Sequence, residues 1–289
     1  MILDGHIHID GYKPDIPAFE AGLAEAGVSG GVVISMSPNC FHKRSAPGDG
    51  ANARLRLDSL FQRVGGKADL YPLFWIDPME ADALEQVDIA CGYGVLGFKV
   101  ICGHHYPYDD KPMEVFRKIA SVGKPILFHS GILWDGKFSS PYNRPAGFEA
   151  LLDVENLRFS LAHASWPWCD ECIAVYGKFL NTKSSGEGTS AEMYIDITPG
   201  TPEIYRRELL TKLHTVGYDV ENNIIFGSDC LYDNYSGSYS RHWIDIDMEI
   251  YRELGLSQDA IDKTFGGNLK RFLGLTGEKK EYRPLTQMR

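Results

Sequence analysis

The chain has 289 residues, of which 44% are hydrophobic and 24% are charged, and its formal net charge is −10. This length is compatible with two domains, but α/β barrels often form one domain of about 200 to 250 residues or more. The acidic balance argues against a nucleic-acid surface and against an anionic membrane, since both require a basic patch. We therefore expect a small-molecule substrate as the partner, and a homo-oligomer remains open.

No segment resembles a leader peptide or a membrane anchor. The start of the chain lacks the charged and apolar regions of a secretory signal, and its first histidines lie too close to Met1 for a leader to precede them. No apolar run approaches the length of a membrane span. Six cysteines without a secretory signal indicate reduced thiols, so we expect a cytoplasmic protein.

Apolar runs of strand length alternate with segments of helical periodicity along the chain. Besides a first strand at the start, the predicted strands are residues 31–35, 70–76, 95–101, 124–129, 157–163, 193–197 and 223–228. The predicted helices are residues 16–26, 51–64, one opened by Asp77-Pro78, 112–121, 145–154, 168–180, 202–216, 243–254, 258–264 and 269–273, and residues 181–190 read as a Ser/Gly-rich loop. This rhythm predicts a (β/α)8 TIM barrel in a single domain over residues 1–289.

The first strand ends in His6-Ile7-His8. Residues two apart in a strand point to the same side, so both imidazoles leave one face together. Imidazole is the commonest ligand for zinc and similar metals, which makes the pair a candidate metal site. Taken alone, the motif is weak evidence, because it more often marks two polar residues at the exit of a strand.

Later strand ends supply partners for this pair. His129 ends the fifth predicted strand, His163 ends the sixth, and Asp229 follows the eighth. Parallel strands of a closed barrel deliver their carboxyl ends to one face, and the first and eighth strands become neighbours. Each residue singly is more typical of a polar group that caps a strand or a helix. In combination they predict one site at the mouth of the barrel.

Short motifs spread over the chain carry a family resemblance. They are residues 6–8, 97–100, 124–129, 143–145, 159–163, 227–229 and 266–275, which read HIH, GFKV, KPILFH, NRP, FSLAH, GSD and GGNLKRFLGL. The set resembles the amidohydrolase superfamily, and within it the amidohydrolase-2 group of metal-dependent hydrolases and decarboxylases. The motifs occur in family order and cover nearly the whole chain.

The resemblance implies a role for each residue of the predicted site. His6, His8 and His129 would be imidazole ligands and Asp229 a carboxylate ligand, while His163 would lie beside the metal and steer water or substrate. Three neutral ligands and one anion leave a divalent ion able to lower the pKa of a bound water. Asp229 could also hold the released proton and pass it on. Zinc suits this ligand set best, and manganese, iron or cobalt would also fit.

Lys99 ends the fourth predicted strand and faces the interior if Val95, Gly97 and Lys99 share a side. Some barrels of the superfamily carry a carbamylated lysine there that bridges two metals. In the amidohydrolase-2 group a lysine in this context accompanies a single metal. We therefore expect one divalent ion per chain, with Lys99 as an ion-pair partner or substrate contact.

Residues on the loops after the strands are expected to shape the pocket. They are His42, Lys43, Arg44, His104, His105, Tyr106, Trp134, Arg144, Trp166, Trp168, Tyr232 and Arg241. We predict substrate contacts for Lys99 and for five of these loop residues: His104, Trp134, Arg144, Trp166 and Tyr232. Because guanidinium groups grip carboxylates in two places, these loops favour an anionic substrate. The alternative for each residue is a solvated charge or a packing ring.

Three cysteines lie in contexts that suggest a function, but the neighbouring residues argue against it. Cys169 and Cys172 have the spacing of a redox or zinc motif but no second pair, and the acidic residues between them would raise their pKa values. A helix start is the expected role. Cys230 follows Asp229 and is expected to face outward, because adjacent strand positions point to opposite sides.

Together these features predict a hydrolase that uses a metal-bound hydroxide to cleave a C–O or C–N bond of a small anionic metabolite. The alternative within enzymes is a metal-dependent nonoxidative decarboxylase of an unsaturated or aromatic acid. An alternative of another class is a noncatalytic barrel that acts as a binding protein. Such a protein would be expected to lack at least one ligand, and none is missing. The polymerase-and-histidinol-phosphatase group also begins with HxH, but its later ligand motifs are not found.

Overall fold

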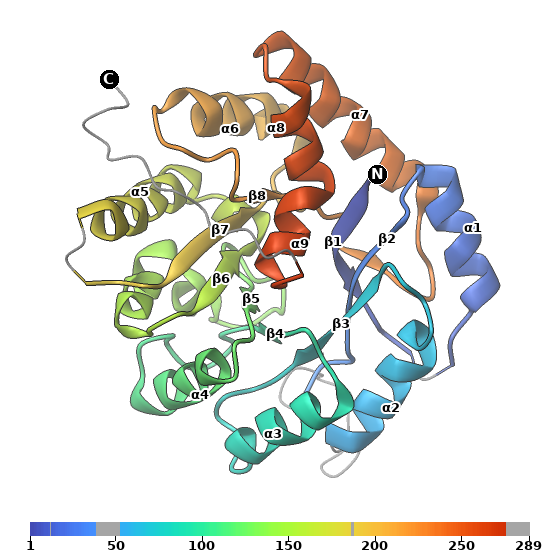
Figure 1. Cartoon of the computed structure of the whole chain (residues 1–289), viewed down its shortest axis with the longest axis vertical. Helices are drawn as coiled ribbons and strands as arrows, with labels where there is room; N and C mark the ends of the chain where they lie inside the picture. The colour runs from blue at the N-terminus through green and yellow to red at the C-terminus, as the bar shows by residue number, and fades with distance from the viewer. Residues whose placement is uncertain (12, 39–52, 186–187, 276–289) are drawn as a thin grey trace.

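The computed structural model describes residues 1–11, 13–38, 53–185 and 188–275. A curled sheet lies at the centre and helices surround it (Figure 1). All neighbouring strands pair in parallel, in the order β8-β7-β6-β5-β4-β3-β2-β1-β9. The strands are β1 (Leu3–His8), β2 (Gly30–Ile34), β3 (Leu70–Trp75), β4 (Gly97–Val100), β5 (Ile126–Phe128), β6 (Arg158–Leu161), β7 (Glu192–Asp196), β8 (Ile224–Ile225) and β9 (Cys230–Leu231). The predicted TIM-barrel fold is confirmed.

The helical layer follows the predicted alternation. The α-helices are α1 (Ile16–Ala26), α2 (Ala53–Val64), α3 (Ala83–Tyr93), α4 (Asp110–Ser121), α5 (Cys169–Ser185), α6 (Glu203–Thr215), α7 (Gly237–Glu253), α8 (Gln258–Asp262) and α9 (Asn268–Phe272). The other helical segments are the 3-10 helices η2 (Ser140–Asn143), η3 (Pro145–Asp153) and η4 (Ala162–Ser165) and the π-helix η5 (Lys263–Gly267). Among the described residues, no helix combines the length and the apolar character that a membrane span requires.

The predicted eighth strand, residues 223–228, is reduced to β8, and a further short strand that was not predicted, β9, follows it and closes the barrel. β8 pairs with β7, whereas β9 pairs with β1. Between the two strands the Gly5 amide donates to the Phe226 carbonyl over 2.9 Å, and the Asp229 amide donates to the His6 carbonyl over 2.9 Å. The link between β8 and β9 therefore lies directly beside the histidines of β1.

Alternate residues of the strands face two different cores. On β3, Tyr71, Leu73 and Trp75 point into the barrel, whereas Phe74 faces the surrounding helices. Helix α9 covers the end of the barrel where the strands begin, and Phe272 packs there with a ring centroid 5.1 Å from that of Tyr194 (Figure 1). The candidate active site lies at the opposite end of the barrel, where the strands finish.

Other predicted segments also differ from the structure, among them the helix predicted for residues 243–254, which as α7 begins already at Gly237. The fifth predicted helix, residues 145–154, is the 3-10 helix η3, in which Gly147 weakens the α-helical pattern. The loop predicted for residues 181–190 was wrong at its start, because α5 continues to Ser185. There the hydroxyls of Thr182, Ser184 and Ser185 donate to carbonyls of their own helix over 2.9 to 3.0 Å, which satisfies the polar side chains without ending the helix.

Candidate active site

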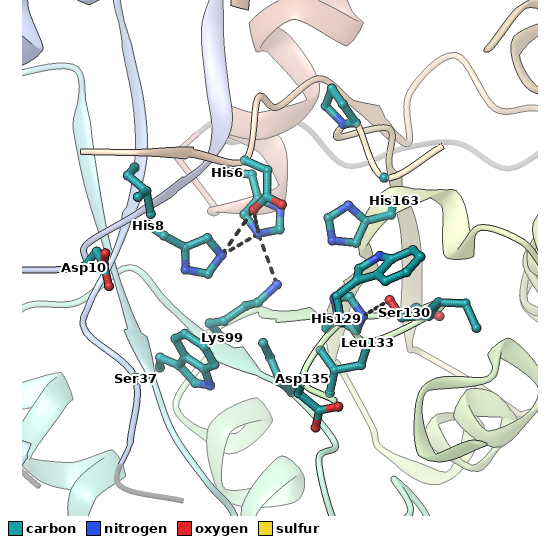
Figure 2. Close-up of a pocket in the computed structure, with 18 of the residues that line it drawn as sticks. His6, His8, Asp10, Ser37, Lys99, His129, Ser130, Leu133, Asp135 and His163 are labelled. Atoms are coloured by element: carbon teal, nitrogen blue, oxygen red, sulfur yellow. Dashed lines mark hydrogen bonds and ion pairs between the residues drawn. The ribbon is translucent and has the colours of Figure 1, made fainter. Parts of the chain in front are cut away.

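The end of β1 presents two histidines to the mouth of the barrel, as predicted. The Nε2 atoms of His6 and His8 lie 3.0 Å apart, and their ring centroids are 5.0 Å apart. Figure 2 shows both imidazoles turned toward the space that Lys99, His129 and His163 also face. The alternation of side chains along β1 therefore brings both rings to one face.

Asp229 joins the pair from the link between β8 and β9. One of its carboxylate oxygens lies 3.6 Å from His6 Nε2 and 3.5 Å from His8 Nε2. Its backbone has a φ of 61°, in the left-handed region that aspartate tolerates better than most residues. Desolvation in the pocket raises the pKa of Asp229 to about 7, an effect that Lys99 opposes and Asp196 strengthens. The carboxyl group can therefore gain or lose a proton near neutral pH.

Asp196, at the end of β7, fixes the orientation of His6. Its carboxylate accepts a hydrogen bond from His6 Nδ1 over 2.8 Å and further bonds from the backbone amide and hydroxyl of Thr198. With its proton on Nδ1, the His6 ring turns the lone pair of Nε2 toward the pocket. Sequence reasoning missed Asp196, although a carboxylate at the end of a predicted strand was the same signal that identified Asp229.

A second missed carboxylate, Asp4, lies below the site in β1. It is fully buried and accepts hydrogen bonds from the amides of His6 (3.0 Å) and Ser228 (2.9 Å) and from the Tyr235 hydroxyl (2.9 Å). Burial raises its pKa to about 6 against these hydrogen bonds. Asp4 thus ties the backbone of His6 to the segment that carries Asp229. An acid inside an apolar strand was the signal available in the sequence.

Lys99, from β4, is the buried cation of the site. Its ammonium Nζ lies 3.2 Å from His6 Nε2. Burial lowers the pKa of Lys99 to about 8, while Asp229 and Asp196 favour the charged form. The side chain faces the interior, as the predicted alternation of strand four requires.

His129 and His163 complete the ring of imidazoles. Their ring centroids lie 5.0 Å apart, and that of His163 is 5.6 Å from that of His6. His129 Nε2 donates to the Ile132 carbonyl over 3.2 Å, and His163 Nδ1 donates to the Thr198 carbonyl over 3.4 Å. The other nitrogen of each ring, Nδ1 of His129 and Nε2 of His163, takes no part in these two hydrogen bonds.

Burial keeps the imidazoles of the site uncharged at neutral pH. It lowers the pKa values of His6, His8 and His129 well below their usual range, with further lowering by neighbouring positive charge. The pKa of His163 falls to about 4 for the same main reason. Neutral imidazoles have the lone pairs that metal coordination and general base catalysis require.

The backbone around His163 is strained. His163, Ala164 and Ser165 have φ values of 60°, 43° and 62° in succession, although none of them is glycine. Together with Asp229 they are four of the five non-glycine residues with a positive φ in the described part of the chain. Strained backbone of this kind concentrates at functional sites, where the surrounding structure compensates its cost.

A pocket of about 410 Å³ opens above these residues. Its lining includes Trp134 and Trp166, as predicted, and also Trp75. The lining residues are His6, His8, Ile9, Asp10, Ser37, Trp75, Lys99, Ile101, His129, Ser130, Ile132, Leu133, Trp134, Asp135, His163, Trp166, Pro199, Gly200, Asp229 and Leu231. This volume suits a small metabolite.

Three predicted substrate contacts lie outside this lining. Tyr232 is fully buried and stacks on Phe19 at 3.8 Å, because it faces the helical layer. Arg144 is exposed and pairs with Glu171 over 2.8 Å. His104 faces Asp77 instead of the pocket. For these residues the side of the strand or the local partner decides the direction of the side chain.

The remaining basic residues that were predicted on the loops add no positive charge to the described pocket lining. Arg241 pairs with Asp245 on its own helix, and His42, Lys43 and Arg44 lie outside the described residues. Lys99 is therefore the single lysine or arginine in the described lining. The expected cluster of arginines around the site is not found in the described part of the chain.

The cysteines take the structural roles that the sequence indicates. Cys169 begins α5, and burial raises the pKa values of Cys169 and Cys172 to about 11 and 12. Cys230 is buried in the outer core, where its sulfur lies 3.4 Å from the Ser240 hydroxyl. Thiols with such pKa values are poor nucleophiles.

The donor set at the mouth fits a divalent metal ion. His6, His8 and Asp229 each offer one ligand atom, and these atoms all lie within 4.8 Å of one another. The bond from His6 Nδ1 to Asp196 reproduces the second layer of a carboxylate–histidine–metal arrangement. His129 lines the same pocket but is not part of this group of three. Its role as a fourth ligand stays a prediction.

Comparison with known proteins places the chain in a family. A family model described as amidohydrolase, of the amidohydrolase-2 type, matches residues 43–275. The chain belongs to the amidohydrolase family. Amidohydrolases are metal-dependent enzymes, and the donor group described above can hold a metal in this member. A comparison with curated proteins finds no match.

Solved structures similar to this amidohydrolase share its fold. IDCase from Metarhizium anisopliae, in its apo form, is 14% identical with a TM-score of 0.60, covering 95% of this chain and 97% of its own. A 2,6-dihydroxybenzoate decarboxylase complexed with 2,6-dihydroxybenzoate is 13% identical with a TM-score of 0.59, covering 95% and 98%. A probable 2-pyrone-4,6-dicarboxylic acid hydrolase from Acinetobacter baumannii with citric acid bound is 12% identical with a TM-score of 0.57, covering 94% and 99%. At these identities the likeness concerns the fold.

Proposed function

We propose that this amidohydrolase hydrolyses a C–O or C–N bond of a small anionic substrate at the mouth of the barrel. The observation that carries the proposal is the convergence of His6 Nε2, His8 Nε2 and the Asp229 carboxylate within 4.8 Å of one another at the floor of the pocket. A divalent ion held by this group, with His129 as a further ligand, would polarise the scissile carbonyl and lower the pKa of a bound water. Zinc is the first choice for such ligands.

Asp229 is the proposed proton carrier. Its carboxylate lies beside the donor nitrogens of His6 and His8, where it can accept the proton that water releases as its oxygen adds to the substrate carbonyl. The same carboxyl then returns this proton to the leaving oxygen or nitrogen as the C–O or C–N bond breaks. His163 contributes a neutral imidazole, anchored at Nδ1, whose other nitrogen can hydrogen-bond the water or the substrate carbonyl.

The lining favours one anionic group on an otherwise flat or apolar substrate. Lys99 is the buried cation that would receive the anion, and Asp10 and Asp135 disfavour further negative charge. Trp75, Trp134 and other apolar side chains supply the walls. A carboxylated lactone or amide matches this distribution of charge and apolar surface.

Metal content and activity, measured together, test the proposal. We expect close to one ion per chain at this site in the native protein and its loss in His6→Ala, with hydrolysis of a panel of carboxylated lactones and amides lost in parallel. His214→Phe is the matched control, because His214 lies in α6, outside the pocket lining and the donor group, and its removal should spare both properties. Full hydrolysis by metal-free protein, or by His6→Ala, would refute the mechanism.

A nonoxidative decarboxylase is the second candidate, and the aromatic walls favour it. Trp75, Trp134 and Trp166 can flank a planar conjugated acid, and 2,6-dihydroxybenzoate decarboxylase shares the fold. In that reaction the C–CO₂ bond breaks and a protonated Asp229 could deliver a proton to carbon. Carbon dioxide release from aromatic or muconate-like acids, with deuterium incorporated from heavy water, would favour this candidate. Its absence alongside hydrolysis of lactones or amides would exclude it.

A further inference from the structure

A second group of potential metal ligands lies on the loops that follow β3 and β4. Asp77 comes just after β3, and His104 and His105 lie between β4 and α4. The ligand atoms of these three side chains all lie within 4.8 Å of one another. None of the three lines the barrel pocket, so the group is separate from the proposed active site.

His105 is the residue that most needs a partner. Its side chain is buried, with 2% of the residue exposed, and neither ring nitrogen has a hydrogen-bond partner among the described residues. An unpaired buried polar group lowers the stability of the folded state, so native proteins rarely retain one without a reason. Burial also lowers the pKa of His105 to about 4, which leaves the ring neutral with a free lone pair.

Asp77 and His104 complement this ring. One oxygen of Asp77 accepts a hydrogen bond from the Met79 amide over 2.9 Å, and the other lies 3.7 Å from His104 Nε2. Asp77 is buried, whereas the side chain of His104 is 48% exposed and gives solvent a route to the group. An ion pair between Asp77 and a protonated His104 would account for these two residues but would leave both nitrogens of His105 unpaired.

We propose that Asp77, His104 and His105 form a second site for a divalent metal ion. Two imidazole nitrogens and one carboxylate oxygen are ligands that suit zinc, and water would take the remaining position. An ion there would connect the loop after β3 to the loop after β4, next to Trp75 and Ile101 of the pocket lining. The expected role is to hold these two loops at the mouth.

The number of ions bound by the full chain tests this site. The native protein is equilibrated with Zn²⁺ and dialysed, and metal per chain is measured by mass spectrometry. We expect two ions in the native chain, one in His105→Phe and one in His6→Ala. His214→Phe is the matched control. His214 is a partly buried histidine whose Nε2 also has no hydrogen-bond partner in the described part of the chain, but it belongs to neither group of ligands, so this variant should retain both ions.

A second variant keeps the test valid if His105→Phe fails to fold. Asp77→Asn preserves the size of the side chain and an oxygen for the Met79 amide, and we expect it to weaken the second ion at least tenfold in a titration with Co²⁺ followed by visible absorption. Unchanged binding of both ions in Asp77→Asn and His105→Phe would overturn the proposal.

The outcomes separate this proposal from the proposed function. A native chain that binds a single ion, lost in His6→Ala and kept in His105→Phe, would refute the loop site and leave the barrel site standing. A single ion with the reverse behaviour would refute the barrel site and support the loop site. A chain that binds no ion under these conditions would refute both.

Discussion

At its start, β1 places Leu3 in an apolar core, and at its end the same strand places His6 and His8 in a polar pocket. The other strands repeat this contrast: their beginnings are covered by α9, whereas their ends carry Lys99 and His129 (Figures 1 and 2). Asp196 ends β7 in the same way. The apolar end can gain stability from close packing, while the mouth holds desolvated charges and strained backbone. We infer that stability and chemistry are assigned to opposite ends of the same strands.

The largest expected effect comes from the mouth. Asp229→Asn keeps the size of the side chain but removes the carboxylate that carries the proton, so we expect kcat/KM to fall by about 10³-fold. The free energy of unfolding of the metal-free protein should stay about the same, since the replaced side chain is partly exposed and similar in size. Steady-state kinetics and urea denaturation on one preparation measure both. A large loss of stability in this variant would break the separation of the two ends.

The reciprocal change is made at the apolar end. Phe272→Ala removes a buried ring that packs on Tyr194, and we expect a loss of about 3 to 5 kcal/mol in the free energy of unfolding. Activity per folded molecule should be unchanged, because Phe272 does not line the pocket. A lower kcat per folded molecule would contradict this expectation, because the packing of Phe272 in α9 would then affect the geometry of the active site.

A smaller effect is expected from the residue that orients His6. In Asp196→Asn the His6 ring loses its charged partner, and we expect metal affinity to weaken about 10 to 100-fold. Equilibrium dialysis measures this change, and Ser37→Ala, at another position of the lining, is the control. Unaltered affinity in Asp196→Asn would show that the barrel alone orients the ring.

The smallest effect concerns acid stability and arises at neither end. His214 lies in α6 of the helical layer, and burial lowers its pKa to about 4. Because an unfolded chain with a histidine pKa near 6.5 binds the proton more readily, His214 reduces stability as the pH falls from about 6.5 to 4. His214→Phe should therefore flatten the pH dependence of the melting temperature in this window. Identical slopes in native and variant proteins would contradict this assignment.

The sequence determined much of this arrangement. The alternation of apolar strands and helices gave the barrel, and the helix predicted for residues 16–26 matches α1 at both ends because its signals are local: apolar spacing, Pro17 and a closing glycine. The period of two along β1 placed His6 and His8 on one face. The end positions of four strands placed Lys99, His129, His163 and Asp229 around them. Periodicity and strand ends are properties of short segments, and a parallel barrel converts them into a common location.

Only the tertiary structure decided which groups meet. The bond between His6 and Asp196 spans 190 positions of sequence, and it depends on the register of strands on separate parts of the barrel. The shortening of the eighth strand, the burial of Tyr232 and the pairing of Arg144 with Glu171 have the same origin. A local sequence pattern predicts that a side chain is polar and lies near the end of a strand. The direction of the side chain and its protonation depend on neighbours that are distant in sequence and become close through packing.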